Sequence, residues 1–128
     1  MRRRKAIPIE QRVIAREKAL EAKTRLPESL HNAILTHSVR THRMSWKKTR
    51  LLDEVLRKTY RKGDVWIFDS PVTLTAYRAD CNDRSARKLI QRMVAEGLLT
   101  PANNGKSYGK PKEYIVAVVQ GMVETMAA

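Results

Sequence analysis

Between positions 45 and 63, apolar residues recur at the spacing of an amphipathic helix. Ser45 is a favourable N-cap residue and Gly63 a favourable stop, so the pattern predicts a helix that ends by Gly63. Its apolar face is formed by Trp46, Leu52, Val55, Leu56 and Tyr60. A short apolar β-type run follows at residues 65–68. We expect both Trp46 and Trp66 to lie in the core.

Two further helices are predicted after this run. A short one begins either at Ser70, before Pro71, or at Thr75. A longer one covers residues 83–96, with Asn82 as its N-cap and Gly97 just past its end. At about 100° per residue, its apolar positions fall on one side of the helix. These positions are Ala86, Leu89, Ile90, Met93 and Val94.

The opposite side of the 83–96 helix is basic and polar. It carries Arg84, Lys88, Gln91 and Ala95, flanked by Ser85, Arg87 and Arg92. No acidic residue occurs between Asp83 and Glu96. Basic surface helices are common, so a merely solvated face explains this helix equally well when it is considered alone.

A hairpin is predicted after the longer helix. Leu98 and Leu99 begin one strand, and the β-branched residues 113–119 form the closing strand. The turn-rich segment between them, over residues 101–112, is basic. Its polar residues are Asn103, Asn104, Lys106, Ser107, Tyr108 and Lys110. Gly105 and Gly109 permit a close approach to another backbone.

The first 44 residues are predicted to form a basic arm followed by two helices. One helix covers residues 9–24, and the other starts at Pro27, with Leu30, Ala33, Ile34 and His37 at helical spacing. Their apolar stripes are narrow, so we expect them to pack on the main domain or on a second subunit. The predicted division is therefore an extension over 1–44, a domain over 45–119, and a tail or short helix over 120–128. Val118, Met122 and Met126 recur at four-residue spacing in that last region.

Charge narrows the possible partners. The 128 residues carry 26 Lys and Arg against 13 Asp and Glu, a formal charge of +13, while 42% of residues are apolar. Residues 1–50 hold 14 basic and 4 acidic side chains, and residues 51–128 hold 12 and 9. Such an excess attracts polyanions: DNA, RNA or an anionic membrane surface. The alternative is a diffuse charge that serves only solubility.

At this point the chain resembles the winged helix-turn-helix family. The resemblance rests on TAYRADCNDRSARKLIQRMVAEGLL, followed by NNGKSYGKPKEYIVAV, and covers about residues 46–119. It implies an α+β, mainly helical fold in which helix 83–96 enters the DNA major groove and the hairpin is the wing. The turn is Asp80-Cys81-Asn82. Many members have Gly-Leu-Ser there.

The residues on these two elements have the chemistry that DNA recognition requires. Arg and Lys can donate to guanine, and Gln can pair with adenine. Asn82 and Ser85 suit phosphate contacts at a helix N-terminus. The predicted DNA-binding residues are Asn82, Arg84, Ser85, Arg87, Lys88, Gln91, Arg92, Asn103, Asn104, Lys106, Ser107, Tyr108 and Lys110.

Two further basic groups have open interpretations. Arg2, Arg3 and Arg4 form either an arm that neutralises phosphates or a tail without a specific role. Lys47 and Lys48 either touch the flanking DNA backbone or are simply solvated.

Other chemistry has little support in the sequence. His31, His37 and His42 match no common metal-binding spacing, and Cys81 is the only cysteine. Nucleotide-binding and nucleophile motifs are missing, and no apolar run approaches the roughly 20 residues of a membrane span. We therefore expect no enzyme activity, metal, cofactor or membrane partner, and a cytoplasmic, nucleoid-associated location.

The sequence as a whole favours a sequence-specific, double-stranded DNA-binding transcriptional regulator that forms a homodimer. The small size suits a plasmid or phage regulator. One alternative is a replication or partition protein that binds iterated origin sites. Another is an RNA-binding ribonucleoprotein factor, for which exposed aromatic residues would be the distinguishing feature.

Overall fold

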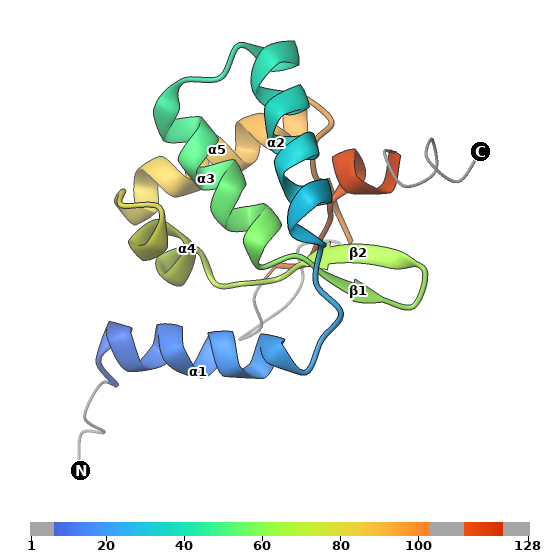
Figure 1. Cartoon of the computed structure of the whole chain (residues 1–128). Helices are drawn as coiled ribbons and strands as arrows, with labels where there is room; N and C mark the ends of the chain where they lie inside the picture. Colours follow the sequence, from blue (N-terminus) through green and yellow to red (C-terminus); the bar gives the residue numbers. More distant parts are fainter. Residues whose placement is uncertain (1–6, 103–111, 122–128) are drawn as a thin grey trace.

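The computed structural model describes residues 7–102 and 112–121 (Figure 1). This part of the chain is α+β and mainly helical, as predicted. It contains the helices α1 to α5, a four-stranded antiparallel sheet and a further helical stretch at residues 117–121. In chain order they are α1 (Ile9–Glu21), α2 (Glu28–His42), α3 (Trp46–Arg57), β1 (Tyr60–Lys62), β2 (Val65–Phe68), α4 (Val72–Arg78), α5 (Asp83–Ala95), β3 (Thr100–Pro101) and β4 (Tyr114–Ile115).

Helix α3 starts as predicted but ends earlier than predicted. The Ser45 hydroxyl caps it by accepting a hydrogen bond from the Lys48 amide at 3.3 Å. The helix stops at Arg57, and Tyr60, which was predicted to lie on it, begins β1 instead. Gly63 has a φ of +63° and turns β1 into β2, which is a hairpin role and not a helix stop. Pairing with the apolar strand β2 draws these residues out of the helix.

The sheet has the strand order β1-β2-β4-β3. Ile67 of β2 pairs with Tyr60 on one side and with Ile115 on the other, and Thr100 of β3 also pairs with Ile115. The strand predicted at residues 65–68 is therefore confirmed. The antiparallel pairing of the two strands that flank the predicted wing is confirmed as well. The first of them begins at Thr100, however, and not at Leu98 and Leu99, whose side chains are buried in the core.

The closing strand is much shorter than the predicted 113–119. Only Tyr114 and Ile115 are strand, and residues 117–121 are helical. The buried side chains Val116 and Val119 are three residues apart, which is helical spacing, and the Gln120 amide donates to the Val116 carbonyl at 3.1 Å. Burial of both valines outweighs their β-propensity. Met122 and Met126 of the predicted C-terminal helix lie outside the described residues.

The core is built around α3, whose Leu51, Leu52 and Val55 are fully buried. Helices α2, α4 and α5 and the sheet pack around it, with α4 next to α5 (Figure 1). The largest buried side chains of this cluster outside α3 are Ile34, Phe68, Met93, Leu99, Val116 and Val119. Trp66 also belongs to it, as predicted.

Trp46 does not lie in the core, contrary to our prediction. Its side chain is 64% exposed, and the Arg50 guanidinium lies 5.6 Å from the ring centroid. At about 100° per residue, Trp46 falls on the side of α3 opposite Leu51 and Val55. Helix geometry therefore turns this first residue toward solvent.

Helix α2 packs against α3 and contributes Ile34 to the same core. It begins directly after Pro27, as predicted. The predicted stripe is only partly right, because Ala33 and His37 are exposed and Ser38 is buried on the same helix as Ile34. Contact with α3 selects a face rotated from the one that apolarity alone indicates.

Helix α1 lies at the bottom of Figure 1, away from the connection between α2 and α3 at the top. It ends at Glu21, three residues before the predicted end, and buries Val13 and Leu20. Ion pairs hold it in place. Arg16 pairs with Asp69, and Glu17 lies 3.4 Å from the Lys58 ammonium and 3.5 Å from the Arg78 guanidinium.

Candidate nucleic-acid interface

The candidate interface is centred on α5. The Asn82 side-chain oxygen accepts a hydrogen bond from the Ser85 amide at 2.8 Å, which confirms the predicted N-cap. The Thr73 hydroxyl donates to the Asp83 carboxylate at 2.8 Å and so ties the first turn of α5 to α4. Gly97, with a φ of +79°, follows the end of the helix. The start and end of the helix are therefore set by local residues.

The turn between α4 and α5 is tight and internally hydrogen-bonded. The Cys81 amide donates to the Ala76 carbonyl at 3.0 Å, and the Asp80 amide to the Tyr77 carbonyl at 3.3 Å. Asp80 has a φ of +57°, a left-handed conformation that Asp tolerates better than most residues. The turn therefore includes one residue with positive φ, at the first position of Asp80-Cys81-Asn82.

The apolar side of α5 is anchored as predicted. Ala86, Ile90 and Met93 are buried in the core, while Leu89 and Val94 are partly buried against it. Three buried side chains spread over two turns fix both the position of the helix and its rotation about its own axis. The polar residues between them consequently have a defined direction.

The polar side of α5 faces solvent. Ser85 is half-buried, and the longer polar side chains are exposed. These are Arg84, Arg87, Lys88, Gln91 and Arg92. Within residues 7–102 and 112–121, none of these five side chains makes an ion pair or a side-chain hydrogen bond. Asn82 is exposed as well, although its oxygen is occupied by the cap.

Glu96, just beyond α5, secures the far end of the helix. It pairs with the Lys48 ammonium, and its second oxygen lies 3.3 Å from His42 Nδ1. Lys48 is only 7% exposed and engaged by Glu96, so it fits neither alternative that the sequence left open, a contact with the flanking DNA backbone or a solvated side chain. Lys47 is exposed. The sequence holds no signal for this cluster, because its members come from three separate segments.

The hairpin strands bring the ends of the predicted wing together. The Ala102 amide donates to the Glu113 carbonyl at 2.8 Å, just beyond the paired residues Pro101 and Tyr114. The wing residues that we predicted to contact DNA lie outside the described residues, as do Arg2, Arg3 and Arg4. They are Asn103, Asn104, Lys106, Ser107, Tyr108 and Lys110.

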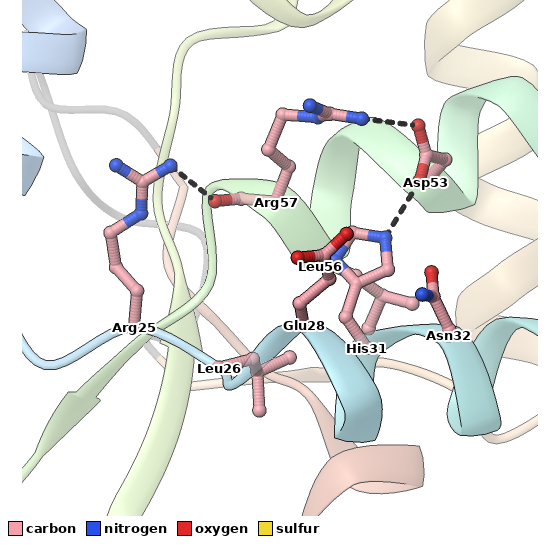
Figure 2. Close-up of a pocket in the computed structure, with 8 residues that line it drawn as sticks. All are labelled: Arg25, Leu26, Glu28, His31, Asn32, Asp53, Leu56 and Arg57. Carbon is pink, nitrogen blue, oxygen red and sulfur yellow. Dashed lines mark hydrogen bonds and ion pairs between the residues drawn. The ribbon is translucent and has the colours of Figure 1, made fainter.

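A separate polar pocket of about 220 Å³ lies between α2 and α3 (Figure 2). One Asp53 oxygen is 2.6 Å from His31 Nε2, and the other accepts from Arg57 at 3.0 Å. Burial raises the pKa of Asp53, but hydrogen bonds from His31 and Arg57 outweigh it and leave the pKa below its usual value. Asp53 of α3 is thus linked both to His31 of α2 and to Arg57, one turn further along α3.

No three His, Cys, Asp or Glu side chains among residues 7–102 and 112–121 are grouped to hold a metal ion. Within the same ranges, no helix has both the length and the apolarity needed to cross a bilayer.

Comparisons with protein-family models, with curated proteins and with solved structures found no match.

Proposed function

We propose that this chain is a winged helix-turn-helix protein that binds double-stranded DNA in a sequence-specific manner, with α5 as the recognition helix. One observation carries the proposal. Helix α5 exposes five long cationic or amide side chains, while Ala86, Ile90 and Met93 hold its other side in the core. A rigidly mounted helix of this composition is what major-groove recognition requires.

The order of elements supports the same proposal. Helix α3, strand β2, helices α4 and α5, and the β3–β4 hairpin follow one another in the order of the winged helix. Strands β2, β4 and β3 are neighbours in the sheet, and β1 is an additional edge strand. In this arrangement the loop between β3 and β4 is the wing.

The chemistry of α5 suggests how bases are read. Arg84 and Lys88 lie four residues apart on the outer side of the helix and donate to guanine O6 and N7. Gln91, on the same side, pairs with adenine. The side-chain oxygen of Asn82 accepts the capping hydrogen bond from the Ser85 amide. The side-chain nitrogen of Asn82 donates to a phosphate. We further propose that the protein acts as a homodimeric transcriptional regulator.

Selection of bound sequences from a random duplex pool tests this function directly. We expect one enriched motif, and a symmetric motif if the protein binds as a homodimer. Affinity for the selected duplex should fall with salt, with a slope in log affinity of about −0.9 per phosphate neutralised. Failure to enrich any motif, a flat salt response, or displacement of the duplex by structured RNA at lower concentration would each contradict the proposal.

A further inference from the structure

The connection between α2 and α3 presents a second basic surface, separate from the outer side of α5. We call it the α2–α3 corner, and it lies at the top of Figure 1, at the opposite end of the molecule from α1. Its residues are Arg40, Arg43, Trp46, Lys47 and Arg50, and all five are exposed or partly exposed. The packing of the core uses none of these side chains.

Arg43 stands in a backbone conformation that favours glycine. It caps the end of α2 with φ 47° and ψ 54°, and its amide donates to the Val39 carbonyl. A left-handed conformation costs a non-glycine residue about 1 kcal/mol or more. Attraction to the helix dipole explains a cation near this end, but Arg40 and His42 already lie in the last turn. An arginine at this position therefore indicates a function for its side chain.

Trp46 is the second feature that folding alone does not explain. Its side chain is 64% exposed, and the Arg50 guanidinium lies 5.6 Å from the centre of its ring. Arg50 in turn lies 3.8 Å from Asp80, in the turn between α4 and α5. A large aromatic ring on the solvent side of α3 gains little from folding, so it is available for an outside partner.

The charge of the corner identifies the partner as an anion. Within the described part of the chain, Arg40, Arg43 and Lys47 have no carboxylate partner. Glu96, the acidic residue at the neighbouring end of α5, is already engaged by Lys48 and His42. The corner is therefore a concentrated positive surface that includes an exposed aromatic ring.

The corner is continuous with the helix-turn-helix. Lys48, which follows Lys47 in α3, pairs with Glu96 at the C-terminal end of α5. At the other end of α5, burial and Asp80 raise the pKa of the Cys81 thiol, while Arg50 and Lys47 act in the opposite direction. Cations of the corner thus lie near the α4–α5 turn.

We propose that the α2–α3 corner binds the sugar–phosphate backbone of the DNA that flanks the segment read by α5. Arg40, Arg43 and Lys47 neutralise phosphates, and the Trp46 ring packs on deoxyribose with its indole N–H toward a phosphate. This inference rests on the DNA binding proposed above. It extends the contact beyond the helix-turn-helix to α2, a segment that the sequence assigns to an extension.

The first test compares Arg43→Gly with Arg12→Ala, a matched removal of one exposed positive charge on α1. Glycine suits the left-handed position, so Arg43→Gly should keep or raise the melting temperature. It should weaken specific and non-specific duplex binding alike, by roughly three- to tenfold, and reduce the salt slope by about one unit. Arg12→Ala should change neither. Equal effects of the two variants would overturn the inference.

The second test follows Trp46 by acrylamide quenching, with Trp66, only 9% exposed, as an internal reference. The Trp46→Phe variant gives the Trp66 signal alone. On saturation with a fluorescently labelled duplex, monitored by anisotropy, we expect the Trp46 quenching constant to fall at least about twofold. Duplex binding without protection of Trp46 would overturn the corner contact and leave the function of α5 standing. No duplex binding by the unmodified protein would overturn both.

Discussion

Neighbouring lysines in α3 have opposite environments. Lys47 is exposed, whereas Lys48 is 7% exposed and pairs with Glu96. One residue along a helix is a rotation of about 100°, enough to move a side chain from solvent to the interface with α5. Their chemistry is identical, so their positions on the helix alone give them different functions.

We expect Lys48→Ala to lower the free energy of unfolding by roughly 1–3 kcal/mol, because it leaves a partly buried Glu96 with only His42. Lys47→Ala is the matched control and should change stability by less than about 0.5 kcal/mol. Urea unfolding at pH 7 measures both. The salt slope of duplex binding should fall only for Lys47→Ala. If Lys48→Ala leaves the free energy of unfolding unchanged and lowers the salt slope instead, the Lys48–Glu96 ion pair does not form in solution.

At the scale of elements, α5 combines two requirements in one helix. Its buried side chains set the angle at which its polar ones are presented, and Thr73 and Glu96 hold its two ends. The helix therefore packs on α3 and α4, which limits its motion relative to the core.

We expect Arg84→Ala and Lys88→Ala to weaken specific duplex binding more than non-specific binding. The loss of specific binding free energy should be roughly 1–3 kcal/mol for each base contact that is removed. Lys106→Ala, in the predicted wing, should weaken both to a similar extent. Titration of selected and scrambled duplexes at one salt concentration provides the comparison. If the three variants reduce specific and non-specific affinity in the same ratio, α5 does not read the bases.

At the scale of the whole molecule, a series of polar contacts connects α1 to the sheet. The Tyr60 hydroxyl donates to Asp69 at 2.9 Å, and the other oxygen of Asp69 pairs with Arg16 of α1. Burial, together with the hydrogen bond to Asp69, raises the pKa of Tyr60 to about 12. Only the neutral phenol can donate to this carboxylate, so ionisation breaks the connection.

The raised pKa predicts a loss of stability in alkali. The neutral phenol is favoured in the folded state, so its contribution is complete below the ordinary value of 10 and is lost as pH rises toward about 12. Burial also raises the pKa of Tyr114, which acts in the same direction. Tyr60→Phe should cost about 1 kcal/mol at pH 8 and show a shallower decline above about pH 10. Parallel urea-unfolding profiles of the two proteins between about pH 8 and pH 11.5 would contradict this assignment.

Elements whose signals are local could be predicted from the sequence. Asn82 marks the start of α5 and Gly97 follows its end, and the apolar spacing between them predicts the buried face of the helix. Both predictions succeed because caps and periodicity act within a few residues of the chain. The candidate DNA-reading face was predictable for the same reason, since it is the side of α5 opposite the apolar residues. The β-type run at 65–68 and the start of α3 at Ser45 also follow from local composition.

Features that depend on distant partners could not be predicted from the sequence. Tyr60 leaves the end of α3 for the sheet because β2 offers backbone pairing. Residues 117–121 are helical because this conformation buries both Val116 and Val119. Lys48 is removed from solvent by Glu96, which lies 48 residues away. The free energy of such contacts comes from groups brought together by folding, so no pattern within a single segment records it.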